Sequence, residues 1–130
     1  MLMFRLTTRS NVPPYVQLTE QVRQALLTGV LREGDRLPTV KDVVGSLAIN
    51  ANTVLKAYRK LEREGLVEGR QGIGTFVLRR PDGPPPGTHA LLQRGLSAWV
   101  GKARRAGMRD ADIESMVRST LAATQSEATA

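Results

Sequence analysis

Apolar residues recur at helical spacing in the first half of the chain, where they predict three short helices. One amphipathic helix ends at Gly29, with its apolar face formed by Tyr15, Leu18, Val22, Ala25 and Leu26. A second helix is expected from about Val40 to Leu47, because Thr39 and Asp42 have the spacing of a capping box. Asn50 is a suitable cap for a third helix, which closes at Gly65. Two short helices joined by a turn of about three residues are typical of a helix-turn-helix.

After Gly65 the apolar pattern changes from helical to extended, and this change predicts a β-hairpin. The expected strands are residues 66–68 and 75–78, and the turn between them, residues 69–74, is rich in glycine. Three helices followed by such a hairpin form a winged helix-turn-helix. The predicted fold class is therefore mainly α, of the α+β kind.

A proline-rich segment, residues 81–87, divides the chain into two parts. Four of its seven residues are proline and two are glycine, so neither a helix nor a sheet is expected to continue through it. We therefore expect a winged helix-turn-helix domain at residues 1–80 and a stiff linker at 81–87. A helical hairpin is predicted at residues 88–124, followed by a small, polar and disordered tail at 125–130.

Two apolar stripes run along the predicted helical hairpin. The first ends before Gly107, and the second follows Asp110, which is expected to cap its helix. Because the hairpin is shorter than the roughly 40 residues that an isolated core needs, a second copy of the chain is the expected partner, across a two-fold interface. The predicted dimerisation residues are Leu92, Leu96, Trp99, Val100, Ala103, Ile113, Met116, Val117 and Leu121. The alternative is that the hairpin packs against its own winged domain.

Positive charge is concentrated in the winged part of the chain. The 130 residues include 19 Lys and Arg against 12 Asp and Glu, a net charge of +7. Residues 1–80 hold 13 of these basic and 7 of these acidic residues, a net +6. Such an excess indicates a polyanionic partner, and nucleic acid is the first candidate.

The composition also excludes several classes of site. The chain has no cysteine and a single histidine, His89, which excludes a disulfide framework, a Cys-based metal site and a multi-histidine metal site. No apolar run approaches the roughly 18 residues of a membrane span, so we expect a cytoplasmic protein without a membrane partner. No catalytic constellation stands out, so we predict no enzyme, no metal and no cofactor.

The candidate DNA-binding residues lie on the predicted helix-turn-helix and on the tip of the hairpin. Side chains at the start of a helix in the major groove reach base edges, and an asparagine there can pair with adenine. The predicted contacts are Arg36, Thr39, Lys41, Asn50, Asn52, Thr53, Lys56 and Arg59, with Arg70, Gln71 and Gly72 at the tip for a minor groove. The alternatives are that Asn50 is only a helix cap, that the charges are solvated surface charges and that the tip is a plain turn.

The order and density of these motifs resemble the GntR family of bacterial transcriptional regulators. The resemblance rests on four segments: LPTVKDV from Leu37, INANTVLKAY from Ile49, LEREGLV from Leu61 and GIGTFV from Gly72. The short segment after the hairpin is similar to the YtrA-type subfamily, which implies a two-helix dimerisation segment and, often, control of an operon with membrane-transporter genes. In this chain Lys41 replaces a usual arginine of the family.

The leading prediction is a homodimeric, sequence-specific DNA-binding repressor with a palindromic, double-stranded operator. A small-molecule effector is left open, because about 50 residues after the wing leave little room to enclose a pocket. The alternative is an architectural or adaptor module that binds DNA with little sequence preference and holds another protein through its helical hairpin.

Overall fold

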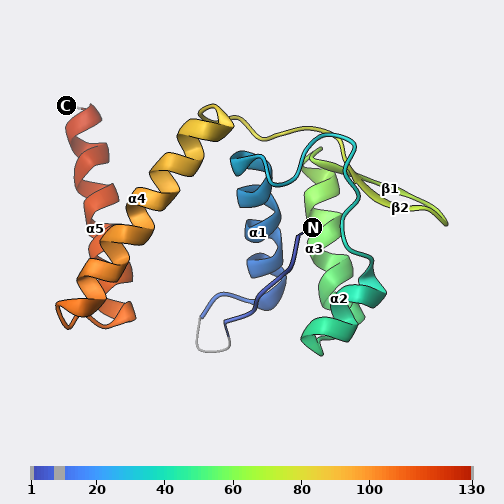
Figure 1. The fold of residues 1–130 in the computed structure, drawn as a ribbon, viewed down its shortest axis with the longest axis horizontal. Coiled ribbons are helices and arrows are strands. Elements are labelled where there is room, and N and C mark those ends of the chain that lie inside the picture. The colour runs from blue at the N-terminus through green and yellow to red at the C-terminus, as the bar shows by residue number, and fades with distance from the viewer. Residues whose placement is uncertain (1, 8–10, 130) are drawn as a thin grey trace. The chain divides into compact units, whose positions relative to one another are not determined.

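Three helices and a β-hairpin build the first of two units in the chain. The computed structural model describes residues 2–7 and 11–129, and it divides the chain into a unit at Met1–Ala90 and a unit at Leu91–Ala130. The first unit contains α1 (Pro14–Thr28), α2 (Val40–Leu47), α3 (Ala51–Arg63), β1 (Val67–Arg70) and β2 (Gly74–Val77) (Figure 1). The predicted winged helix-turn-helix and the mainly helical fold class are confirmed.

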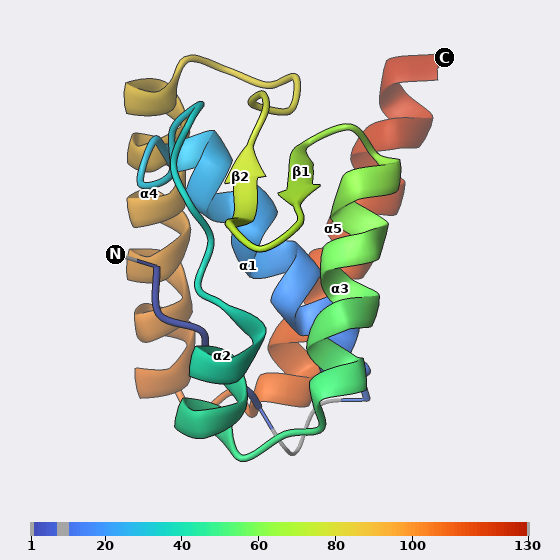
Figure 2. The ribbon, with the colours of Figure 1, turned by 90° about the vertical axis from the view of Figure 1, so that its right-hand side faces the viewer.

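The core of the first unit lies between α1 and α3, which are neighbours in both ribbon views (Figures 1 and 2). Leu18, Val22 and Leu26 repeat along α1 at the predicted spacing, and each is at most 1% exposed. They belong to one apolar cluster with Val54 and Leu61 of α3. Burying a side chain of this size stabilises the fold by about 1.5–3 kcal/mol, so this cluster holds α3 firmly against α1.

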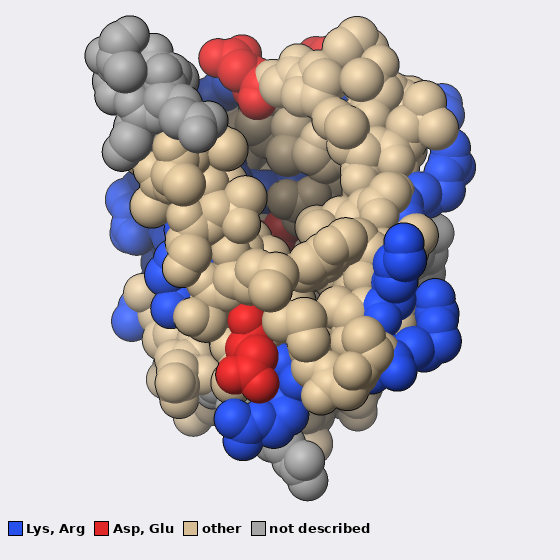
Figure 3. Space-filling model, turned by 90° about the vertical axis from the view of Figure 1, so that its left-hand side faces the viewer, with Lys and Arg blue, Asp and Glu red and all other residues tan. Residues whose placement is uncertain are grey.

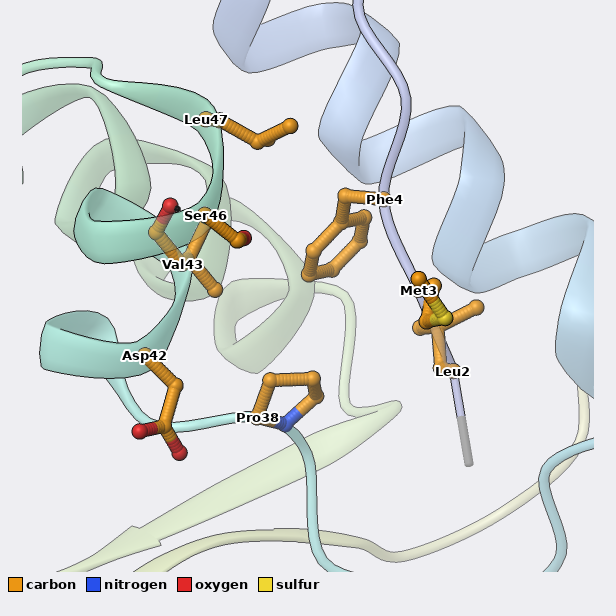
Figure 4. Close-up of a pocket in the computed structure, with 8 residues that line it drawn as sticks. All are labelled: Leu2, Met3, Phe4, Pro38, Asp42, Val43, Ser46 and Leu47. Atoms are coloured by element: carbon orange, nitrogen blue, oxygen red, sulfur yellow. Dashed lines mark hydrogen bonds between the residues drawn. The ribbon is translucent and has the colours of Figure 1, made fainter.

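Residues 2–7 lie along α1 as an extended segment. Gln21 accepts a hydrogen bond from the Arg5 N–H at 2.8 Å, and Gln17 accepts one from the Thr7 N–H at 2.8 Å. Phe4, which directly precedes Arg5, reaches the apolar core. Figure 4 shows the cavity of about 270 Å³ that remains between this segment and α2, with Phe4 facing Val43. The segment therefore covers the apolar side of α2.

Local hydrogen bonds explain why α2 has its predicted bounds. The Thr39 hydroxyl accepts a hydrogen bond from the Asp42 N–H at 3.1 Å, as in the first half of a capping box. At the other end, Ala48 adopts the left-handed conformation (φ 54°), the one non-glycine residue of the described chain with a positive φ. This reversal leads into Asn50, whose side-chain oxygen accepts from the Asn52 N–H at 2.8 Å and so caps α3.

The β-hairpin is longer than the sequence predicted, and its turn is shorter. β1 continues through Arg70, which pairs with Gly74, so only residues 71–73 form the turn rather than 69–74. The glycines do not interrupt the antiparallel ladder, because the chain reverses at Gly72, where φ is +75°. The Ile73 N–H closes this turn on the Arg70 carbonyl at 3.0 Å.

The linker ends earlier than predicted, because α4 (Pro86–Arg105) includes the last two residues of 81–87. Proline is tolerated in the first helical turn, where its missing N–H has no intrahelical partner. The start of α4 is tied to α1, since His89 Nε2 lies 3.0 Å from the side-chain oxygen of Gln24.

The second unit contains most of α4 and α5 (Asp110–Thr129), which meet at the turn that joins them. Ala103 and Ile113 are buried at this turn, and in Figure 2 the two helices lean apart away from it. No helix of the described chain is long and apolar enough to cross a membrane.

Two predictions about α5 are wrong. Asp110 does not precede the helix as a cap but is its first residue, and Arg104 donates to its two carboxylate oxygens at 2.9 and 3.1 Å. These hydrogen bonds lower the pKa of the Asp110 carboxyl. The predicted disordered tail is helical through Thr129, because extending an existing helix avoids the cost of nucleating a new one. Ala130 lies outside the described residues.

Candidate nucleic-acid interface

The start of α3 presents polar side chains that the protein itself leaves largely unused. Asn50 and Asn52 are exposed, and Thr53 is half-buried. The side-chain oxygen of Asn50 serves as the helix cap, so its NH₂ group is the part that remains for a partner. The carboxamide of Asn52 has no hydrogen-bond partner among the described residues, so both its donor and its acceptor are available, as adenine recognition requires.

The orientation of α3 is fixed from the segment that precedes α2. The Tyr58 hydroxyl donates a hydrogen bond to the Pro38 carbonyl at 2.6 Å. Burial, and to a smaller extent the charge of Asp42, raise the pKa of the Tyr58 phenol. Tyr58 therefore stays protonated at neutral pH and keeps this hydrogen bond.

Three cations lie exposed on the helix-turn-helix. Lys41 is in the first turn of α2, and Lys56 and Arg59 are on α3. The Lys56 amine lies 4.1 Å from the ring centroid of Tyr15, a cation–π contact that places it between α3 and α1. None of the three forms an ion pair with the described carboxylates, so their charges are available to phosphates.

Arg36 lies beside the wing, a position that sequence spacing alone did not show. The Asp35 carbonyl accepts from the Val77 N–H, and the Leu37 N–H donates to the Thr75 carbonyl, both at 2.8 Å. These bonds place the Arg36 side chain across Gly74, where an added Cβ atom would lie 3.1 Å from Arg36 Nε. Arg36 therefore groups with the wing residues rather than with α2.

The tip of the wing combines charged, polar and apolar side chains. The Arg70 guanidinium lies 4.7 Å from the ring centroid of Phe76 and 3.4 Å from a Glu68 carboxylate oxygen, so it is held along the strands. Gln71 and Gly72 are exposed at the turn. Ile73 is 60% exposed there and was missed by the sequence reasoning, although its place between two glycines was a usable signal.

Together these features allow the protein to bind a DNA duplex through two elements, the start of α3 and the tip of the wing. Figure 2 shows α2, α3 and both strands on the same side of α1. A helix with a polar start fits the major groove, and a β-hairpin with a basic tip fits the adjacent minor groove. The fold and the site thus define a winged helix-turn-helix DNA-binding protein.

Comparison with known proteins gives the family. Residues 14–77 match the family model described as "Bacterial regulatory proteins, gntR family". The chain is 38% identical over 108 residues to the HTH-type transcriptional regulator Rv1152 of Mycobacterium tuberculosis (strain ATCC 25618 / H37Rv), covering 83% of this chain and 85% of that one. The chain therefore belongs to the gntR family of bacterial regulatory proteins, with its DNA-binding domain at residues 14–77.

Similarity to YtrA places the chain with the YtrA-type members of the family. It is 40% identical over 75 residues to the HTH-type transcriptional repressor YtrA of Bacillus subtilis (strain 168), a match that spans 58% of each chain. The structure of YtrA from Sulfolobus acidocaldarius superposes with a TM-score of 0.54 at 21% identity, covering 94% of this chain and 99% of that one.

Two further solved structures share the fold. A transcriptional antiterminator from Listeria monocytogenes EGD-e superposes with a TM-score of 0.58 at 27% identity, over 92% of this chain and 90% of that one. The DNA-binding domain of AraR, in complex with its operator ORE1, superposes with a TM-score of 0.50 at 26% identity, over 59% of this chain and 94% of that one.

Proposed function

We propose that this protein is a homodimeric transcriptional repressor that acts in the cytoplasm on a palindromic operator. The observation that carries the proposal is the exposed, unpartnered carboxamide of Asn52 at the start of α3. The name of the B. subtilis relative, a transcriptional repressor, and the operator complex of the AraR domain support this proposal.

In this proposal the start of α3 reads bases in the major groove. Asn52 pairs with an adenine through its donor and acceptor, and Thr53 offers a hydroxyl and a methyl group to the neighbouring base. Asn50 contributes only its NH₂ group, because its oxygen caps the helix.

The cations around α2, α3 and the wing set the register on the duplex. Lys41, Lys56 and Arg59 bind phosphates, and the hydroxyl of Thr39 at the start of α2 donates to another phosphate. In the wing, Arg36 and Arg70 flank the turn that Gln71 and Gly72 form, and this turn enters the minor groove.

The proposed dimer forms through the second unit, whose apolar side chains remain largely uncovered in one chain. Leu92, Leu96 and Leu121 are 64%, 53% and 65% exposed. Trp99 and Met116 are also exposed, Val100 and Val117 are half-buried, and Ala103 and Ile113 are buried at the turn. In Figure 3, uncharged side chains, drawn in tan, make up most of the surface in view. Helices that lean apart leave both apolar stripes open, and a second pair of helices of the same kind covers them by two-fold symmetry.

A dimer of this kind presents two α3 helices related by a two-fold axis. The operator must then contain two inverted half-sites, about one helical turn or a multiple of it apart. Repression follows if this operator overlaps a promoter.

The experiment first selects an operator from a random duplex library. It then measures the affinity of three variants for this selected operator and for random duplex at equal salt. Asn52→Ala removes a base contact, so we expect about 1–3 kcal/mol weaker operator binding and unchanged binding to random duplex. Lys41→Ala removes a phosphate contact and weakens both equally. Asn11→Ala, an exposed asparagine ahead of α1, is the control and is expected to change neither affinity. If Asn52→Ala weakens both duplexes equally, the base-reading role is wrong and the protein is a low-specificity DNA-binding module.

A further inference from the structure

A cavity of about 390 Å³ lies in the first unit, where the end of α1 approaches the segment that follows the wing. Leu26, Leu31 and Pro86 give it an apolar wall. Its volume is at the lower end of the range for small-molecule sites, about 300–1,000 Å³. The cavity is therefore large enough for a small organic molecule.

Arg80 lines the same cavity and is the unusual group in it. Its Nη2 donates to the Leu27 carbonyl at 2.7 Å and to the Pro84 carbonyl, so it connects the end of α1 with the segment just before α4. Its Nε–H is buried and has no hydrogen-bond partner among the described residues. A buried donor without a partner is rare in native proteins and usually marks a missing water, ion or ligand.

The charge around Arg80 also lacks a counterpart. No described carboxylate lies within ion-pair distance of its guanidinium, whereas Arg23, Arg70, Arg104 and Arg109 each have one. Arg32 adds a second positive charge to the lining, and Glu33 adds one negative charge. A partly buried guanidinium with an unused donor suits an oxyanion, which accepts charge-assisted hydrogen bonds.

We propose that this cavity binds a small carboxylate that pairs with the Arg80 guanidinium and whose apolar chain lies against Leu26, Leu31 and Pro86. The site joins α1 to the segment that leads into α4, so its occupancy alters the contact between Arg80 and Pro84. The ligand then acts as an effector of operator binding. This regulatory role rests on the proposed function, whereas the binding of the carboxylate does not.

The test follows the arginine Nε–H resonances of the ¹⁵N-labelled full chain during titration with sodium hexanoate. Arg80→Lys assigns the resonance of Arg80 by its loss, and sodium chloride at equal ionic strength controls for general salt effects. We expect a saturable shift of the Arg80 resonance with hexanoate and none with chloride. Inorganic phosphate, which has no apolar chain, is expected to bind at least tenfold more weakly. Equal responses to hexanoate and chloride overturn the site, and preferential binding of phosphate overturns the proposed class of ligand.

A second pair of variants tests the site without altering Arg80. Glu33→Gln removes the opposing charge from the lining and is expected to tighten hexanoate binding about two- to fivefold, the size of an exposed charge interaction. Glu20→Gln makes the same charge change at an exposed position of α1 that does not line the cavity, and it is expected to have no effect. Equal tightening in both variants overturns a local site.

The regulatory role is measured on the selected operator with and without hexanoate. We expect a changed operator affinity in the wild type and a smaller change in Arg80→Lys. If hexanoate binds but operator affinity stays the same, the effector role is wrong. If no operator can be selected at all, the proposed function fails, while the hexanoate titration still decides the site.

Discussion

Replacement of Leu92 by alanine should weaken the dimer strongly, and the structure sets the magnitude. Leucine exceeds alanine by three carbon atoms, so full burial of the difference is worth about 2.4 kcal/mol at ~0.8 kcal/mol per carbon. Leu92 is 64% exposed in one chain, so its complete burial in the dimer is worth about 1.5 kcal/mol. Each dimer contains two copies of the substituted residue, so the free energy of dimerisation weakens by about 3 kcal/mol and the dimer Kd rises by about 100-fold.

Sedimentation equilibrium over a range of protein concentrations measures this Kd directly, because it reports the average mass, which for a pure monomer is 14.2 kDa. The matched control is Val30→Ala, an apolar side chain of the first unit with a similar exposed fraction, 62%. We expect Val30→Ala to keep the wild-type Kd. An unchanged Kd for Leu92→Ala would refute the assignment of the second unit as the dimer interface.

Three further predictions concern stability, each measured by urea unfolding. Gly74→Ala should destabilise the fold by about 1–3 kcal/mol, because φ there is +143° and the added Cβ meets Arg36. Gly45→Ala, in open space on α2, should instead stabilise the fold by about 0.5–1 kcal/mol. A stabilising effect of Gly74→Ala would contradict the described wing. Thr39→Ala should cost about 1 kcal/mol and Thr39→Ser much less, since the hydroxyl caps α2; equal losses would argue against the cap. Burial raises the pKa of Tyr58 above its unfolded value of about 10, so the free energy of unfolding should keep its full value below pH 10 and fall above it. Tyr58→Phe should lower the free energy of unfolding by about 1 kcal/mol at pH 8 and should remove part of this pH dependence.

Short-range signals predicted most of the fold. The capping residues Thr39 and Asn50 act on backbone N–H groups two or three residues away, so the sequence alone located both helices of the helix-turn-helix. The apolar repeat of α1 predicted its helix equally well, because residues spaced at the 3.6-residue helical period lie on one face, which is buried.

The errors arose where partners distant in sequence decide the structure. Arg36 joins the wing through main-chain pairing with β2, about 40 residues further along the chain, which no local pattern encodes. The error at Asp110, by contrast, is a local one. Aspartate is a common helix cap, but here it is the first residue of α5 and pairs with Arg104, six residues earlier at the end of α4. The bonds of Arg80 to Leu27 and Pro84 also depend on the folded chain, so the cavity beside it had no sequence signal.

The central claim is that two chains together read an inverted repeat. Selection of bound sequences from a random duplex library at near-physiological salt, with the mass of the complex measured on the winning duplex, tests it most directly. We predict an inverted repeat with half-sites about one helical turn, or a multiple of it, apart, occupied by two chains. No enriched sequence, or one chain per duplex, would contradict the account.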